Sequence, residues 1–174
     1  TYSVTGVDLD FLKAGETITF SYTVATTDSS GLLGATVTDT IAFKIIGTND
    51  TPNISPTAPT IFTEDANASS QNLNDSGTVS FDDIDDTDVI DISFASNSNI
   101  EWSGGTLDTT LATSLTDGFS VTTLTDAAAP GSTPWTYSVT GVDLDFLKAG
   151  ETITFSYTVA TTDSSGLLGA TVTD

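Results

Sequence analysis

Residues 17–24 read TITFSYTV, and the same eight letters return at residues 152–159. Apolar side chains alternate with threonine and serine along this stretch, which is the pattern of an antiparallel strand with one buried face. One face of this strand is expected to be buried, and the alternation assigns to it Ile18, Phe20, Tyr22 and Val24. A chain built from such strands is predicted to bury its apolar faces by packing sheets together.

This strand belongs to a much longer repeat. Residues 1–39 are identical to residues 136–174, so the second copy begins 135 positions after the first. A repeat of this length without one substitution is typical of a tandem array, and we expect the chain to be an excerpt of one. Identical units cannot each carry a different specificity, and they therefore add length, valency or spacing.

Short segments with a period of two recur along the rest of the chain. They cover Ile41 to Ile45, Val79 to Phe81, Ile90 to Phe94, Phe119 to Val121, and Tyr137 to Val139. Glycine-containing turn signals separate them. This spacing predicts an all-β fold, an antiparallel β-sandwich. Leu144 and Leu147, three residues apart and followed by Gly150, predict one short helical turn at residues 142–150 and again at 7–15.

The boundary between repeats is expected in the segment from Gly47 to Pro56, where prolines and small polar residues follow a strand. Residues 1–51 would then be the C-terminal part of one repeat, and residues 52–174 the next repeat. Periodicity predicts that this second unit lacks its last strand, the equivalent of Ile41 to Ile46. A free strand position favours strand exchange between neighbouring chains.

The composition excludes several classes of function. The chain has 24 acidic and 3 basic side chains, no histidine and no cysteine, and its formal charge is −21. Nucleic acids and anionic membrane surfaces need lysine and arginine, so neither is an expected partner. No apolar run approaches the roughly 20 residues of a membrane span. We expect no enzyme, because the commonest general bases and nucleophiles are missing.

Several motifs together resemble a known family. They are the segments Trp135 to Val139, Leu144 to Thr152 and Phe155 to Val159, the turn Asp163 to Gly166, the ending Gly47 to Pro52, and the acidic segment Gly77 to Asp88. Together, and in their order along a repeat of 135 residues, they resemble the VCBS repeat of giant bacterial adhesins secreted by type I systems, the RTX-type proteins. The resemblance implies a cadherin-like or immunoglobulin-like sandwich, calcium-stiffened tandem domains, and a location outside the cell, on the surface of a Gram-negative-type bacterium.

The acidic segment supplies the first group of candidate metal ligands. Five carboxylates fall within seven residues, at Asp82, Asp83, Asp85, Asp86 and Asp88. Such groups repel one another unless a hard divalent cation with oxygen ligands lies between them, and Ca²⁺ suits an all-protein site better than Mg²⁺. On an extended segment Asp83 and Asp85 point the same way, and Asp88 closes the site beyond a bend. Asp82 and Asp86 should point the other way. The alternative is an acidic, solvated loop.

A second group of candidate ligands flanks the boundary. Asn49 and Asp50 end one repeat, and Glu64 and Asp65 lie in the first loop of the next. In a cadherin-like arrangement these residues meet the acidic loop at the junction between domains, where a shared ion removes a hinge. The alternative for Asn49 and Asp50 is a simple turn before proline.

The remaining acids and the tryptophans are expected to be structural. Asp28 and its copy Asp163 lie in D-S-S-G turns, where a hairpin role is the expected one. Trp135 and Trp102 are expected in the core, although Trp102 precedes Ser103-Gly104-Gly105 and leaves a sugar-stacking role open. The favoured function is an extender module that projects distal binding domains from the cell. Direct binding of glycan or a surface, and homophilic cohesion in biofilm, are the alternatives.

Overall fold

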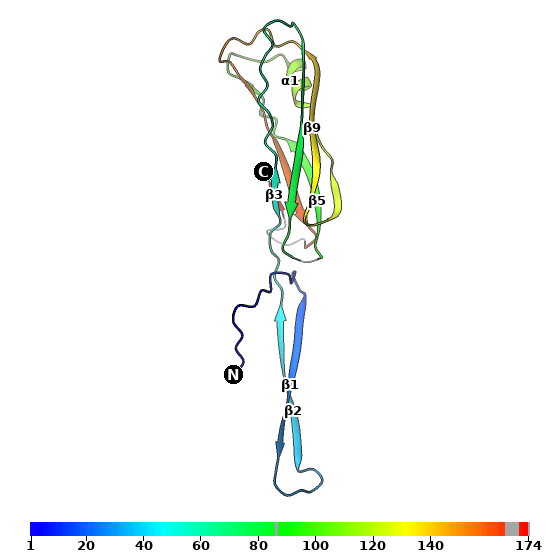
Figure 1. Cartoon of the computed structure of the whole chain (residues 1–174). Helices are drawn as coiled ribbons and strands as arrows, with labels where there is room; N and C mark the ends of the chain where they lie inside the picture. The colour runs from blue at the N-terminus through cyan, green and yellow to red at the C-terminus, as the bar shows by residue number, and fades with distance from the viewer. Residues whose placement is uncertain (86, 166–170, 174) are drawn as a thin grey trace.

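The structure is a computed structural model that describes residues 1–85, 87–165 and 171–173, the last three as backbone. It is mostly β-structure, in two parts that follow one another along one long axis (Figure 1). A two-stranded hairpin forms the first part, and a sandwich with one helix forms the second. Among the described residues, no helix is long and apolar enough to cross a membrane.

The hairpin pairs β1 (Thr17–Thr27) with β2 (Thr36–Ile46) in continuous antiparallel register. The predicted strand at residues 17–24 is therefore confirmed, but its apolar face is largely exposed. Val24 is 48% exposed, whereas its copy Val159 is 5% exposed, because strands from residues 52–135 cover the second copy. In the hairpin, the rings of Phe20 and Phe43 stack on each other at 5.2 Å instead.

The second part contains two four-stranded antiparallel sheets. The first has the order β3-β4-β9-β7 and consists of β3 (Asn53–Pro56), β4 (Gln71–Asp82), β9 (Gly131–Val142) and β7 (Phe119–Val121). The second has the order β12-β11-β5-β8 and consists of β12 (Thr171–Thr173), β11 (Tyr157–Asp163), β5 (Val89–Ser96) and β8 (Leu124–Ala128). A short pair, β6 (Glu101–Trp102) with β10 (Ile153–Thr154), lies beside them.

The two sheets enclose one apolar core, and the predicted all-β sandwich is confirmed at this level. Buried side chains come from both sheets, including Val79 and Trp135 from the first and Ile90 from the second. Across the interface, the ring of Phe119 stacks on that of Tyr157 at 4.2 Å. The core role expected for Trp135 is confirmed, because this side chain is 3% exposed.

The predicted helical turn at residues 142–150 is wrong. This segment forms two hydrogen-bonded turns, in which the Leu147 amide donates to the Leu144 carbonyl at 2.9 Å and the Glu151 amide to the Lys148 carbonyl at 2.8 Å. The Asp143 carboxylate accepts a hydrogen bond from the Asp145 amide at 3.0 Å, and such local bonds compete with helix formation.

The helix lies elsewhere, at α1 (Thr109–Thr116). Its N-cap is Asp108, whose carboxylate accepts hydrogen bonds from the amides of Thr110 and Leu111, and Leu115 is buried. The spacing of Leu111 and Leu115 is the sequence signal for this helix. The many threonines around it, which have low helix propensity, obscured that signal.

Strand β4 runs along the sandwich from one of its ends to the other. The C-terminal end of β4 lies toward the hairpin, and its N-terminal end lies at the far end of the sandwich (Figure 1). The loop at residues 143–150 follows β9 at that opposite end. Its identical copy at residues 7–15 lies where the hairpin meets the sandwich, so the two copies of this loop occupy equivalent positions in successive units.

Candidate metal centre

The junction between the two parts begins with a tight backbone contact at Gly47. Its amide donates to the Glu16 carbonyl at 2.8 Å, and its carbonyl accepts from the Gly15 amide at 3.4 Å. A Cβ atom on Gly47 would lie 2.3 Å from the Leu12 carbonyl oxygen and 2.4 Å from that of Lys13. Only glycine fits here, and this contact fixes the direction in which Asn49 and Asp50 leave the first part.

The acidic loop between β4 and β5 faces this linker. Thr87 has a φ of 72°, which is rare for a β-branched residue and costs about 1–3 kcal/mol. The bend is closed by a 3.3 Å hydrogen bond from the Asp88 amide to the Asp85 carbonyl. This bend turns Asp88 back toward Asp83. A bend before Asp88 was predicted from the sequence.

Three carboxylates converge at this bend. Oxygens of Asp83, Asp88 and Asp163 all lie within 4.8 Å of one another. Calcium–oxygen distances are about 2.3–2.6 Å, so ligands on opposite sides of one ion are about 4.8 Å apart. The spacing of the three carboxylates therefore fits a single calcium ion.

The linker completes the group from the other side. The Asp50 amide donates to Oδ2 of Asp85 at 2.8 Å, and the Asn49 side-chain amide donates to Oδ2 of Asp163 at 3.2 Å. Asp85 and Asp163 are only 3% and 5% exposed. Residues of the linker and of the following unit thus form one continuous polar cluster.

Four oxygens of this cluster are buried without a hydrogen-bond donor among the residues that the structure describes. They are Oδ1 of Asn49, Oδ2 of Asp83, Oδ1 of Asp85 and Oδ2 of Asp88. A buried acceptor that lacks a partner costs about 1–3 kcal/mol, and more when it is charged. An oxygen-liganded divalent cation would satisfy all four, which makes these residues a candidate calcium site rather than an acidic loop alone.

The charges of the cluster are poorly balanced without a cation. Lys13 places its Nζ 3.1 Å from Oδ1 of Asp88, and Ser164 donates to the same oxygen at 2.8 Å. Burial raises the pKa of Asp83, and the charges of Asp163, Asp85 and Asp88 raise it further. Burial also raises the pKa of Asp85, with further contributions from Asp50, Asp88 and Asp163. Each shift shows that negative charge in this cluster is unfavourable.

The other predicted ligands lie apart from this cluster or outside the described residues. Asp82 is exposed, and its Oδ1 accepts a 2.9 Å hydrogen bond from the Asp83 amide. Asp86 is outside the described residues. Glu64 lines a shallow hollow with Asp145, and the Asp65 amide donates to Gln71 Oε1 at 2.7 Å. Glu64 and Asp65 therefore lie at the opposite end of the sandwich, beside the loop at residues 143–150.

Asp163 is the residue that sequence reasoning missed. Its Oδ1 accepts a 2.8 Å hydrogen bond from the Ser165 amide, so it holds its turn as Asp28 does with Ser30 at 2.7 Å. Its Oδ2, however, faces the linker. The two copies are identical in sequence, so no local signal separates their roles. The pairing of Asp163 with Ile90 in β5 brings it beside Asp88.

Comparisons of the chain with protein-family models, with curated proteins and with solved structures found no match. The functional argument therefore rests on the repeat and on the geometry of the junction.

Proposed function

We propose that the chain is part of an array of extender repeats, in which calcium stiffens the junction between neighbouring repeats. The observation that carries this proposal is the composition of the cluster. Asp83, Asp85, Asp88 and Asp163 belong to one unit, whereas Asn49 and Asp50 belong to the linker that precedes it.

Such a site acts as a removable brace. The linker is held at one end by Gly47 and at the other by β3, which pairs with β4. An ion bound between them would fix the few residues in between and would replace a hinge by a stiff connection. The two parts already lie end to end (Figure 1), so each additional repeat would extend the array by a constant length.

The resemblance to VCBS repeats supports a finer version of this proposal. The sandwich would be of the cadherin-like or immunoglobulin-like type, and the array would extend from the surface of a Gram-negative-type bacterium after type I secretion. Distal domains of the same adhesin would bind the target. The excess of acidic over basic side chains, 24 against 3, is consistent with a protein that folds where calcium is abundant.

The proposal is tested by thermal unfolding of the chain, followed by circular dichroism in EDTA, in millimolar Ca²⁺ and in millimolar Mg²⁺. A ligand at 100 times its Kd adds about 2.7 kcal/mol of stability, which in a chain of this size raises the Tm by about 5–10 °C. We expect this rise with Ca²⁺ and a much smaller one with Mg²⁺. An equal Tm in EDTA and in Ca²⁺ would refute the calcium site.

Small-angle X-ray scattering of the same samples tests the stiffening itself. With Ca²⁺, the pair-distance distribution should match one rigid arrangement of the two parts, with a maximum dimension no smaller than in EDTA. If scattering describes a flexible particle at saturating Ca²⁺, the ion does not brace the junction.

A groove of about 530 Å³ favours a second candidate, direct glycan binding. It is lined by Trp102, Phe146 and Asp108, a combination of aromatic rings and a hydrogen-bonding acid that suits sugars. The Trp102 indole also donates to Glu151 at 3.3 Å, which fixes its ring. A glycan array probed with the chain and with Trp102→Ala tests this candidate, and a signal that Trp102→Ala does not reduce would exclude the groove.

A further inference from the structure

A lysine from the first part of the chain reaches the carboxylate cluster of the second. Nζ of Lys13 lies 3.1 Å from Oδ1 of Asp88, and the side chains of Lys13 and Asp88 are 31% and 1% exposed. Lys13 is one of only three basic residues in the chain, with Lys44 and Lys148. A sequence with so few basic residues nevertheless places one of them against a buried carboxylate of the cluster.

The backbone holds this lysine in place. The Lys13 carbonyl packs against Gly47, and it accepts a 3.0 Å hydrogen bond from the Glu16 amide. The ammonium group is therefore presented from a fixed turn rather than from a free loop. The ion pair is largely removed from solvent at Asp88, where screening by salt is weak.

We propose that Lys13 is a tethered cation by which one repeat docks onto the carboxylate cluster of the next and holds the two in line before a free cation binds. This inference rests on the junction site described above, and it assigns to that junction a protein partner, the neighbouring copy of the repeat. Four carboxylates against one ammonium leave a strong negative excess, so the lysine lowers the repulsion without removing the demand for a divalent ion.

The lysine and a divalent ion do not compete for the same atom. Oδ1 of Asp88 accepts from Lys13 and Ser164, whereas Oδ2 of Asp88 is buried and has no donor within residues 1–85, 87–165 and 171–173. The same carboxylate can therefore bind the tethered cation on one oxygen and the free cation on the other.

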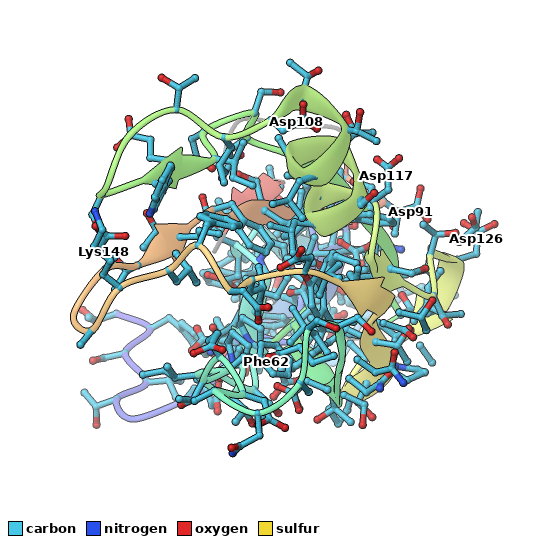
Figure 2. All side chains as sticks on the ribbon, turned by 90° about the horizontal axis from the view of Figure 1, so that it is seen from above. Phe62, Asp91, Asp108, Asp117, Asp126 and Lys148 are labelled. Atoms are coloured by element: carbon cyan, nitrogen blue, oxygen red, sulfur yellow. The ribbon has the colours of Figure 1, made fainter. Side chains whose placement is uncertain are left out.

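The repeat carries the same lysine at its other end. Lys148 is the copy of Lys13, its side chain is 84% exposed, and its Nζ lies 3.7 Å from Glu151. Figure 2 shows Lys148 at the rim of the sandwich, on the loop that follows β9. The partner of Lys148 is Asp88 of a following copy. A lysine at one end and a carboxylate cluster at the other make a head-to-tail contact that propagates along the array.

The test uses the absence of cysteine from the chain. Spin labels at Thr23→Cys on β1 and Ser80→Cys on β4, both exposed positions, report the distance between the two parts by pulsed electron paramagnetic resonance. In EDTA we expect a narrow distance distribution for the otherwise unchanged chain. With Lys13→Gln, residues 48–52 act as a short flexible linker spanning roughly 12 Å, so the distribution should become at least about twofold broader.

Two variants serve as controls. Lys13→Arg keeps the charge and should keep the narrow distribution. Lys148→Gln removes the same charge from the same sequence context but not from this junction, and it should also leave the distribution narrow. Equal widths for Lys13→Gln and the parent chain, or a broad distribution in the parent chain itself, would overturn the proposal. Equal broadening by Lys148→Gln would assign the effect to net charge and would overturn it too.

Adding millimolar Ca²⁺ separates this inference from the proposed function. If Ca²⁺ narrows the distribution of Lys13→Gln, the calcium brace operates without the lysine. If Lys13→Gln is broad in EDTA and Ca²⁺ changes neither its width nor the Tm of the parent chain, the tethered cation stands and the calcium proposal fails.

Discussion

The side-chain amide of Asn49 donates a hydrogen bond to Oδ2 of Asp163 at 3.2 Å, although 114 positions separate the two residues. Asn49 lies in the linker, and Asp163 ends β11. The contact exists because β11 pairs with β5, which begins directly after the acidic loop. Sheet topology, rather than proximity in sequence, thus assembles the two sides of the candidate calcium site.

The role of Asp163 gives the first prediction. In Asp163→Asn, one of the three converging carboxylates loses its charge, so the affinity for Ca²⁺ should fall by at least about tenfold, the effect of 1.4 kcal/mol. Isothermal titration calorimetry with Ca²⁺ measures this change.

The chain supplies its own control, because Asp28→Asn makes the same change in the identical turn of the first copy. Both aspartates accept a hydrogen bond from the serine amide two positions later, at 2.7 Å for Asp28 and 2.8 Å for Asp163. Effects on the turn should therefore be alike, and only Asp163→Asn should weaken Ca²⁺ binding. Equal losses in both variants would remove Asp163 from the site.

The raised pKa of Asp85 gives a prediction about pH. Because its pKa in the folded state lies above the ordinary 3.8, the native state binds more protons than the unfolded state between these two values. In EDTA, the ionised cluster is destabilising at neutral pH, and this cost is relieved as the pH falls through the raised pKa. Replacing Asp85 by asparagine removes the cost at all pH values.

We therefore expect Asp85→Asn to be more stable than the parent chain at pH 7 in EDTA, with the difference shrinking toward pH 4. Aspartates outside the cluster titrate equally in both proteins and cancel in the comparison. Inside the cluster, removing the charge of Asp85 also lowers the pKa of Asp83, which adds to the difference in the same direction. In Ca²⁺ the order should reverse at pH 7, since the ion requires ionised ligands. Urea unfolding across this pH range measures the difference, and a constant difference would show that Asp85 does not titrate abnormally.

Much of the fold follows from local patterns in the sequence. The alternation at residues 17–24 and at Ile90 to Phe94 predicted strands that the structure contains, because a period of two has few other solutions. The helix was misplaced, because Leu144 and Leu147 mimic a helical spacing. The turns there are instead closed by hydrogen bonds that the Asp143 carboxylate and the Lys148 carbonyl accept from backbone amides. In such a short segment the local signals for a helix and for turns are of similar strength, so the packing around the segment determines which of the two forms.

The candidate site was predictable only in part. Asp83, Asp85 and Asp88 are close in sequence, and the convergence of Asp83 with Asp88 followed from chain geometry, whereas Asp85 accepts from the Asp50 amide of the linker. Asp163 could be placed only with the β11–β5 register, and the orientation of Asn49 depends on the contact at Gly47. Glu64 and Asp65 were expected beside the acidic loop, but the length of β4 separates them from it. Long-range strand pairing carries this information, and a single sequence does not display it.

The contact at Gly47 predicts that its replacement loosens the junction. In Gly47→Ala, the new methyl group would overlap the carbonyl oxygens of Leu12 and Lys13, which lie 2.3 and 2.4 Å from its position. The backbone must move, and the linker loses its fixed direction. Limited proteolysis should then cleave near residues 47–52 at least several-fold faster, since cleavage follows the population of open states.

Thr48→Ala is the matched control, because Thr48 is exposed and adjacent in the same linker. Its cleavage rate should stay close to that of the parent chain in both EDTA and Ca²⁺. If Gly47→Ala is cleaved no faster than Thr48→Ala, the linker does not depend on the close approach at Gly47.

Tyr137 links β9 to the end of α1, and its loss should lower stability. Its hydroxyl donates to the Leu115 carbonyl at 3.0 Å, and burial raises the pKa of Tyr137 to about 12, so the donor keeps its proton at any working pH. Tyr137→Phe leaves a buried carbonyl without this donor and should lower the free energy of unfolding, measured in urea, by about 1–2 kcal/mol.

Tyr2→Phe is the matched control, because it changes the identical position of the first copy, where the side chain is 48% exposed. It should change the free energy of unfolding by less than about 0.5 kcal/mol. Similar losses in both variants would mean that position in the repeat, and not burial against α1, determines the contribution of this tyrosine.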